Sequence, residues 1–306
     1  MSLTQKSKII DGINRLKKEK NAVILAHCYQ ELEIDEVADI VGDSLFLSQK
    51  AAETEADIII FAGVYFMAET AKILSPDKKV FLPREESGCL MADMINAESL
   101  RAFKAKHPGI PVVCYVNSSA ETKAESDICC TSANAVKVVE SLPDKKIIFA
   151  PDKGLGAYIA SQLPDKEIIL YYGYCPTHMR IRPEEILALK NTYKDAEVLA
   201  HPECSMEVIT LADFTGSTSG IMKRVKESRS KTFIIATEKG VAERLQRDFP
   251  DKEFILASKK AICENMKWNH LEDILNSLKN EVHEVFVEEN LSKKAFNSIK
   301  RMLDVS

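Results

Sequence analysis

An internal repeat of about 87 residues constrains the fold of this 306-residue chain more than any other feature. Each copy carries four landmarks: an apolar strand ending in a polar residue, a hydroxyl residue before a helical pattern, a Pro-Asp-Lys turn, and a cysteine after a short apolar strand. The landmarks are His27, Ser44, Pro76 and Cys89, then Asn117, Ser132, Pro164 and Cys175, and finally His201, Thr218, Pro250 and Cys263. All four shift by the same 174 positions between the first and third copies, as from His27 to His201. Four features in one register indicate a triplicated unit.

The pattern within each copy predicts the order strand, helix, strand, helix, strand. The middle strands are expected at 57–62, 146–150 and 232–236, and the helices include 48–54, 135–142 and 240–249. These middle strands are continuous apolar runs, which are typical of parallel strands buried on both faces by helices. We therefore predict an α/β fold of three repeated three-layer α/β/α units with short parallel sheets, related by a pseudo-threefold axis.

The repeat also predicts where the units begin and end. We expect the first unit at 1–89, the second at 90–175 and the third at 176–263. The remaining tail, 264–306, contains a helical stretch at 271–278, a short strand at 285–287 and a final helix that carries Leu291, Ala295, Ile299 and Leu303. We expect this tail to fold back onto the first unit.

Composition excludes several classes of partner. A net charge of -5 and a pI of about 5.8 provide no basic surface for nucleic acid or for a membrane. The first residues read as an amphipathic helix rather than a signal peptide, and no apolar run reaches the length of a spanning helix. We therefore expect a cytoplasmic protein. In a reducing compartment its eight cysteines are free thiols or metal ligands rather than a disulfide framework.

The landmarks lie where loops follow strands, and this is where open parallel sheets bind ligands. If three units pack about one axis, these loops converge and bring together His27, Asn117 and His201, three hydroxyls and three cysteines. The hydroxyls of Ser44, Ser132 and Thr218 would stand at helix starts, which favour anions. Plain N-capping explains any one of them. Three such hydroxyls at equivalent positions of the three copies favour a site for an anionic ligand.

Three convergent thiols suit zinc or an iron-sulfur cluster. Structural zinc usually uses paired cysteines from a C-x-x-C knuckle, and Cys89, Cys175 and Cys263 have no such partner. A 4Fe-4S cluster bridges separate units more easily, and three thiolates leave one iron open as a Lewis acid. The alternative of three buried apolar cysteines does not explain why each one ends a repeat.

Other cysteines and histidines lack repeat partners. Cys28, Cys114 and Cys204 lie in or after first strands, where they supply either core packing or a fourth ligand, and the Cys129-Cys130 pair reads as structural. The surroundings of His107, His270 and His283 indicate surface positions. His178 follows Cys175 by three residues, so it could orient a substrate or move a proton.

Several motifs carry a resemblance over essentially the whole chain. They are Ala26-His27-Cys28-Tyr29-Gln30, Gly42-Asp43-Ser44, Tyr115-Val116-Asn117-Ser118, Cys129-Cys130-Thr131-Ser132-Ala133-Asn134-Ala135, Gly173-Tyr174-Cys175-Pro176-Thr177-His178, His201-Pro202-Glu203-Cys204 and Cys263-Glu264-Asn265-Met266-Lys267-Trp268-Asn269. With these motifs the chain resembles quinolinate synthase of the bacterial NAD-biosynthetic type. The resemblance implies three α/β/α domains around a 4Fe-4S cluster. It also implies that iminosuccinate condenses with dihydroxyacetone phosphate to give quinolinate, phosphate and water.

The resemblance also assigns roles to residues. It implies that Cys89, Cys175 and Cys263 hold the cluster, that Tyr29 is catalytic and that His178 is a site histidine. The positions that match iminosuccinate contacts are His27, Ser44, Tyr115, Asn117, Ser132, His201, Glu203 and Thr218. Glu203, Tyr29 and His27 are candidates to shuttle protons. Longer relatives carry extra cysteines just before the last ligand, whereas positions 259–262 here hold none, so a redox switch based on those thiols is absent.

Two other classes of function remain open from the sequence. One is a zinc hydrolase, and the other is a non-catalytic iron or redox sensor, which the lack of a basic stripe counts against. The expected partners are the two small substrates, with transient contact to the enzyme that supplies iminosuccinate, and neither nucleic acid nor membrane.

Overall fold

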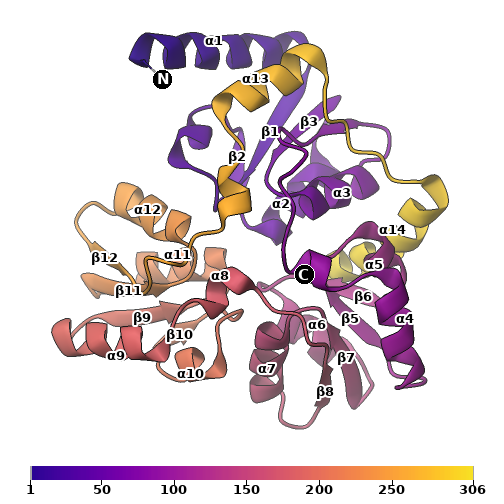
Figure 1. The fold of residues 1–306 in the computed structure, drawn as a ribbon, viewed down its shortest axis with the longest axis vertical. Coiled ribbons are helices and arrows are strands. Elements are labelled where there is room, and N and C mark those ends of the chain that lie inside the picture. The colour runs from indigo at the N-terminus through magenta and orange to yellow at the C-terminus, as the bar shows by residue number, and fades with distance from the viewer. Residues whose placement is uncertain (1, 306) are drawn as a thin grey trace.

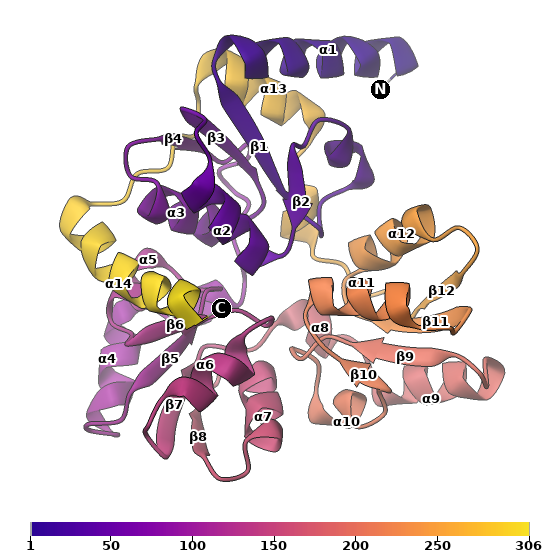
Figure 2. The ribbon, with the colours of Figure 1, turned by 180° about the vertical axis from the view of Figure 1, so that it is seen from behind.

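The computed structural model describes residues 2–305. Within this range the strands form three four-stranded parallel sheets with helices packed against them, so the predicted α/β class with three repeated units is confirmed. Figures 1 and 2 show the three units standing around one centre, each with its own sheet. No helix in the described range is both long enough and apolar enough to cross a bilayer.

All three sheets have the same topology. The first contains β1 (Ala22–His27), β2 (Ile40–Gly42), β3 (Ile58–Ala62) and β4 (Lys79–Phe81) in the order β2-β1-β3-β4. The second contains β5 (Val112–Tyr115), β6 (Ile128–Cys130), β7 (Lys146–Ala150) and β8 (Glu167–Leu170), and the third β9 (Glu197–Ala200), β10 (Phe214–Thr215), β11 (Thr232–Ala236) and β12 (Glu253–Leu256). In each sheet the equivalents of β1 and β3 occupy the two central places.

The prediction missed one short strand in each unit. β2, β6 and β10 are only two or three residues long, too short to show an apolar pattern, and each pairs in parallel with the first strand of its unit. The observed order in each unit is therefore strand, short helix, strand, helix, strand, helix, strand, and the short helix is a 3-10 helix in the first unit. Because of this extra strand, Ser44, Ser132 and Thr218 each lie two or three residues after the carboxyl end of a strand.

Helices cover the sheets and connect their strands, as labelled in Figure 1. They are α1 (Leu3–Glu19), α2 (Ser44–Glu53), α3 (Tyr65–Leu74), α4 (Ala97–Ala105), α5 (Ala120–Ala124), α6 (Ala135–Ser141), α7 (Lys153–Gln162), α8 (Pro176–Met179), α9 (Pro183–Thr192), α10 (Met206–Ile209), α11 (Thr218–Glu227), α12 (Lys239–Asp248), α13 (Leu271–Asn280) and α14 (Glu289–Val305). Short 3-10 helices are η1 (Leu32–Glu36), η2 (Ala92–Met94) and η3 (Glu264–Lys267). The helices expected at 48–54, 135–142 and 240–249 correspond to α2, α6 and α12, and α2 begins four residues earlier than expected.

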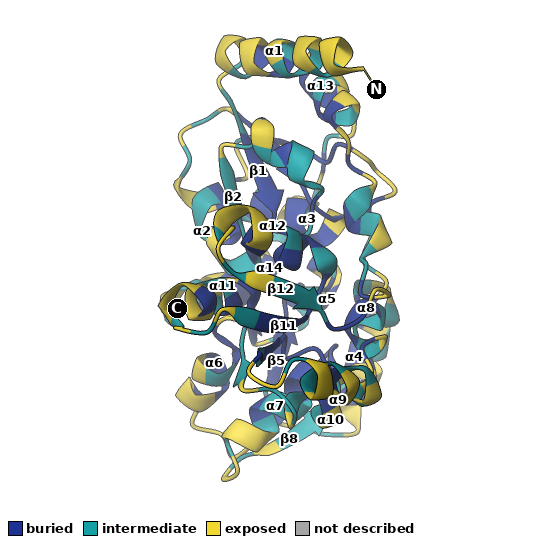
Figure 3. Cartoon of the chain, turned by 90° about the vertical axis from the view of Figure 1, so that its left-hand side faces the viewer, coloured by how far each residue is buried: buried dark blue, intermediate teal, exposed yellow. Residues whose placement is uncertain are grey.

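The central strands form the core of each unit. Every residue of β3 is buried, and so are the last four residues of β7 and of β11. Figure 3 shows buried strands, such as β1, among helices whose outer faces are exposed. The uninterrupted apolar runs in the sequence thus reflect burial on both faces of each sheet.

The tail reaches two units rather than one. Helix α13 packs against α1 and β3 of the first unit. Helix α14 instead packs against α5 and β6 of the second unit, and it also touches α3. The strand expected at 285–287 is not formed in the described residues. A single antiparallel bridge joins Glu284 to Phe81, and the Val285 amide donates to the Val80 carbonyl, so too few bonds form to make a strand. The unit boundaries after residues 89, 175 and 263 remain our proposal.

Candidate metal centre and substrate cavity

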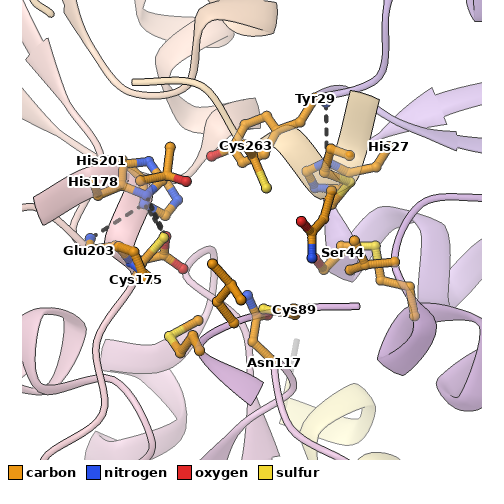
Figure 4. A pocket seen from close by; sticks show the side chains of 18 of the residues that line it. His27, Tyr29, Ser44, Cys89, Asn117, Cys175, His178, His201, Glu203 and Cys263 are labelled. Carbon is orange, nitrogen blue, oxygen red and sulfur yellow. Dashed lines mark hydrogen bonds and ion pairs between the residues drawn. The ribbon is translucent and has the colours of Figure 1, made fainter. Parts of the chain in front are cut away.

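One cavity lies where the carboxyl ends of the three sheets face one another. Every residue singled out as a candidate site residue lines it. They are His27, Tyr29, Ser44, Cys89, Tyr115, Asn117, Ser132, Cys175, His178, His201, Glu203, Thr218 and Cys263. Figure 4 shows the cysteine side chains coming from three separate loops and pointing toward the middle of this space. The structure therefore brings the whole predicted set together.

Each of the three cysteines follows the last strand of its unit. Cys89 lies after β4, Cys175 precedes α8 and Cys263 precedes η3, and all three are free and partly exposed to the cavity. Burial raises the pKa of Cys89 to about 12 and that of Cys263 to about 11. Burial and the nearby Glu203 carboxylate also raise the pKa of Cys175. Such thiols ionise only when a cation replaces the proton, as it does on metal binding.

Two buried carboxylates that the sequence reasoning missed hold two of these cysteine loops. Asp152 Oδ2 accepts a hydrogen bond from the Cys175 amide at 3.0 Å, and Glu238 Oε1 accepts one from the Cys263 amide at 3.3 Å. Asp152 and Glu238 occupy equivalent positions, two residues after β7 and β11, and both are N-caps of the helix that follows. The first unit has Val64 at this position. In the sequence, two of the three copies have an acidic residue two positions after the third apolar strand, and this pattern could have identified Asp152 and Glu238.

Glu203 is the hub of a polar network that joins the second and third units. Its Oε1 accepts a hydrogen bond from the Tyr115 hydroxyl at 2.7 Å, and its Oε2 lies 2.7 Å from His178 Nδ1. His201 Nδ1 lies 3.7 Å from the same Oε2, and the rings of His178 and His201 stack. His201 Nε2 in turn lies 3.2 Å from the Ser132 hydroxyl.

Burial controls the charges in this network. It lowers the pKa of His201 to about 3, and with help from Arg244 it lowers the pKa of His27 to about 3 as well, so both imidazoles are neutral near pH 7. Burial opposes ionisation of Glu203, but the adjacent His178 and the hydrogen bonds from His178 and the Tyr115 hydroxyl outweigh it and lower the Glu203 pKa. The carboxylate is therefore charged and able to accept protons.

None of the three hydroxyl residues is the N-cap of its helix. The cap of α2 is Asp43, whose side chain accepts from the Phe46 amide, and the cap of α11 is Ser217, which accepts from the Gly220 amide. Ser44 and Thr218 are the first residues inside these helices and line the cavity. N-capping thus does not explain them, and their hydroxyls stand at the positive ends of two helix dipoles. Ser132 lies in the loop before α6 rather than at a helix start.

Asn117 provides a second sign that a polar ligand belongs here. Its Oδ1 is buried, lines the cavity wall and has no hydrogen-bond partner among the described residues. A buried acceptor without a partner costs about 1–3 kcal/mol, so such an atom usually meets a ligand or water.

The loop that carries Tyr29 is anchored from the third unit. Buried Arg244 of α12 donates to the carbonyls of Cys28 and Gln30 at 2.8 Å each, and it pairs with Asp35. Lys267 also donates to the Tyr29 carbonyl. The Tyr29 side chain lies beside His27, and its hydroxyl is 3.2 Å from Thr237 Oγ1.

The remaining cysteines do not line the cavity in the described part of the chain. Cys28, Cys114, Cys129, Cys130 and Cys204 are buried, and none of them is in the wall. A fourth cysteine ligand is therefore not supplied by residues 2–305. His107, His270 and His283 are likewise outside this cavity.

The wall offers two sets of metal donors. One is the three cysteines, and the other is Cys175, His178 and Glu203, whose ligand atoms all lie within 4.8 Å of one another. In the second set His178 already bonds to Glu203 through Nδ1 and to Thr237 through Nε2. The three thiols come from three units, and thiols are donors that both zinc and iron-sulfur clusters take.

Thiols, imidazoles and a buried charged carboxylate around one cavity are typical of the active site of an α/β enzyme, and the Cys175, His178 and Glu203 group suggests a metal cofactor. Residues 11–304 match the family model described as "Quinolinate synthetase A protein". The chain is 54% identical over 297 residues to a quinolinate synthase of Alkaliphilus metalliredigens, covering 97% of this chain and 98% of that relative. It is 55% identical over 297 residues to one of Pelobacter propionicus, with the same coverage, and 54% identical over 298 residues to quinolinate synthase 2 of Methanosarcina acetivorans, covering 97% of this chain and 96% of the relative. The chain belongs to the quinolinate synthase family.

Proposed function

We propose that this protein condenses iminosuccinate with dihydroxyacetone phosphate to form quinolinate, with release of phosphate and water, in NAD biosynthesis. The observation that carries the proposal is the convergence of three thiols, two helix starts and the Glu203 network on one cavity. Family membership supports the same conclusion. The proposed setting is the cytoplasm, with transient contact to the enzyme that supplies iminosuccinate.

We further propose a 4Fe-4S cluster held by Cys89, Cys175 and Cys263. Bound by only three thiolates, such a cluster supplies one open iron as a Lewis acid. The donor chemistry of the wall supports it, because each unit contributes one thiol. The Asp152 and Glu238 side chains accept hydrogen bonds from the backbone amides of Cys175 and Cys263, and these bonds fix two of the ligand loops.

The substrate carries carboxylates, and the cavity offers them donors. The hydroxyls of Ser44 and Thr218 and the free amides of α2 and α11 suit two carboxylates of iminosuccinate. The unpartnered Asn117 Oδ1 would accept a hydrogen bond from the substrate nitrogen. His27 and His201 are neutral near pH 7, so they bind polar groups without adding charge. Tyr115 and Ser132 complete the proposed contacts.

We assign the proton transfers to four residues, Glu203, Tyr29, His27 and His178. Glu203 is ionised and reaches the cavity, so it is the candidate base for removing a proton next to a carbonyl or imine. Burial raises the pKa of Tyr29, which keeps its hydroxyl protonated and able to act as an acid. His178 bonds to Glu203 and orients it.

Purification without oxygen tests the proposal. We expect brown protein with iron and acid-labile sulfide in equal amounts, and quinolinate formation from the two substrates. Colourless protein that contains zinc and tolerates air would support the zinc hydrolase, for which the Cys175, His178 and Glu203 set is the site. A labile cluster without quinolinate formation would instead indicate a sensor.

A further inference from the structure

The first unit lacks the acidic residue that anchors the cysteine loop in each of the other two units. In those units the carboxylates of Asp152 and Glu238 each accept a hydrogen bond from the backbone amide of the proposed ligand cysteine. At the equivalent position the first unit has Val64, whose apolar side chain accepts no hydrogen bond. The loop that carries Cys89 therefore requires a different anchor.

A side chain of the third unit supplies such an anchor. Asn265 lies in η3, two residues after Cys263, and it lines the cavity. Its Nδ2 donates a hydrogen bond of 2.9 Å to the carbonyl of Gly88, the residue directly before Cys89. This contact joins residues 177 positions apart, so one side chain links the loops of two proposed ligands.

Asn265 can serve as an anchor because its own backbone is held by the third unit. Glu238 Oε1 accepts from the Cys263 amide, and the Met266 amide donates to the Cys263 carbonyl at 3.1 Å. The Trp268 amide donates to the Asn265 carbonyl at 3.4 Å. The side-chain amide is thus presented from a turn whose two ends are already bonded.

The same segment reaches the first unit at two further carbonyls. Lys267 donates to the Tyr29 carbonyl, and buried Asn269 donates to the Gly63 carbonyl at 2.9 Å. These two carbonyls follow β1 and β3, as the Gly88 carbonyl follows β4. Side chains at alternate positions of one segment therefore hold three loops at the carboxyl end of the first sheet.

The contact with Gly88 requires a donor at position 265. A backbone carbonyl only accepts hydrogen bonds, so the side-chain nitrogen of Asn265 has to face it. An ionised aspartate has the same shape but offers only acceptors, so it would face the carbonyl with a second acceptor. The exchange of asparagine for aspartate therefore breaks the contact without leaving a void.

We propose that Asn265 is a positioning residue that holds the Cys89 loop against the Cys263 loop, in place of the acidic anchor that the first unit lacks. This inference rests on the proposed function, because it concerns the loops of two proposed cluster ligands. Asn265 acts through the Gly88 carbonyl and is not itself a ligand. The hydrogen bond involves only protein groups, so it holds the two loops together whether or not a metal is bound.

Hydrogen exchange of the full chain, purified without oxygen, tests the inference without a need for activity. In Asn265→Asp, the amides of residues 84–92 should exchange about tenfold faster than in the wild type, as expected for the loss of one hydrogen bond. Residues 173–176 should exchange at the wild-type rate, because Asp152 holds the Cys175 amide. Asn265→Ala should show the same difference between the two loops.

The release of iron to a chelator measures the consequence for the cluster. Asn265→Asp should lose its iron about tenfold faster than the wild type, because one ligand loop is no longer held. Asn276→Asp is the matched control, since it makes the same change of charge at an exposed position of α13. It should leave both the exchange of residues 84–92 and the release of iron unchanged.

The outcomes separate a local role from a general one. Equal exchange of residues 84–92 in Asn265→Asp and the wild type would overturn the inference. Equally faster exchange in residues 173–176 would also overturn it, because it would mean that the whole site is loosened. Wild-type protein that binds no iron and makes no quinolinate would overturn the proposed function, and the exchange rates alone would then decide whether Asn265 holds the Cys89 loop.

Discussion

The Tyr115 hydroxyl, at the end of β5 in the second unit, donates a hydrogen bond of 2.7 Å to Glu203 Oε1 in the third unit. Both side chains are buried, and the contact joins residues 88 positions apart. Since His178 and Tyr115 each engage a different oxygen of Glu203, the carboxylate is fixed in orientation while it lines the cavity. This arrangement makes Glu203 the residue on which the proposed chemistry depends most.

Glu203→Gln should keep the cluster and lose turnover. The amide has the same shape but cannot take up a proton, and loss of a general base typically costs 10²–10⁴-fold, so we expect kcat to fall by at least about 100-fold. Iron content and the absorption spectrum should match the wild type. Tyr115→Phe, which removes one donor to Glu203, should have a smaller effect. Loss of iron in Glu203→Gln would mean that Glu203 is structural or a metal ligand.

Alanine at residue 89, 175 or 263 should abolish both the cluster and quinolinate formation, because two thiolates do not retain a labile cluster. Iron and sulfide analysis of the Cys89→Ala, Cys175→Ala and Cys263→Ala proteins checks this. Cys130→Ala is the matched control, since Cys130 is buried but not in the cavity wall. It should retain the cluster and lose about 1 kcal/mol of stability from the small void. Full activity in any of the three ligand variants would reject the site.

Asp152→Asn should weaken cluster retention without touching a ligand side chain. The two carboxylate oxygens accept from the Leu155 amide at 2.6 Å and the Cys175 amide at 3.0 Å, and asparagine would turn a donor toward one of them. We expect a loss of about 1–3 kcal/mol in the free energy of unfolding and faster loss of iron to a chelator. Asp251→Asn, at an exposed ion pair with Lys231, should be close to neutral. Unchanged iron release would show that the Cys175 amide needs no acceptor.

Arg244→Ala should destabilise the contact between the first and third units. The guanidinium is buried and bonds to two carbonyls and to Asp35, so its removal leaves buried acceptors unpaired and should cost about 3–5 kcal/mol. Arg247 pairs with the same Asp35 from an exposed position, so Arg247→Ala should cost less than about 1 kcal/mol. Urea unfolding of both variants makes the comparison. Equal losses would contradict a special role for the buried arginine.

Acid should destabilise the protein through its buried histidines. The folded pKa values of His27 and His201 are lowered to about 3, below the unfolded value of about 6.5, so the unfolded chain binds more protons between these values. Their contribution to stability is present above pH 6.5 and is lost as the pH falls toward 3. Each histidine should add about 1.4 kcal/mol per pH unit to the slope within this window. Urea midpoints measured from pH 7 to 4.5 test this, and His27→Gln should make the slope shallower.

The repeat is visible in the sequence because its signals are local. Apolar runs such as 146–150, the hydroxyl residues and the terminal cysteines each depend on a few neighbouring residues, so the α/β class and the predicted wall residues followed from pattern and resemblance. The short strands β2, β6 and β10 were not predicted, because two or three residues are too few to show the hydrophobic periodicity of a strand. The packing of α14 against the second unit was not predicted, because the apolar face of an amphipathic helix does not specify which surface it packs against.

By itself the sequence determined the triplicated unit, its buried strands and the residue types placed at the strand ends. Only the tertiary structure decided which of these groups bond to one another. The Tyr29 contact with Thr237 spans 208 positions, and the Arg244 contact with Cys28 spans 216, so no local pattern encodes either. Such hydrogen bonds form when packing of the units removes water from polar groups and leaves each buried donor only the acceptors that the fold has placed beside it.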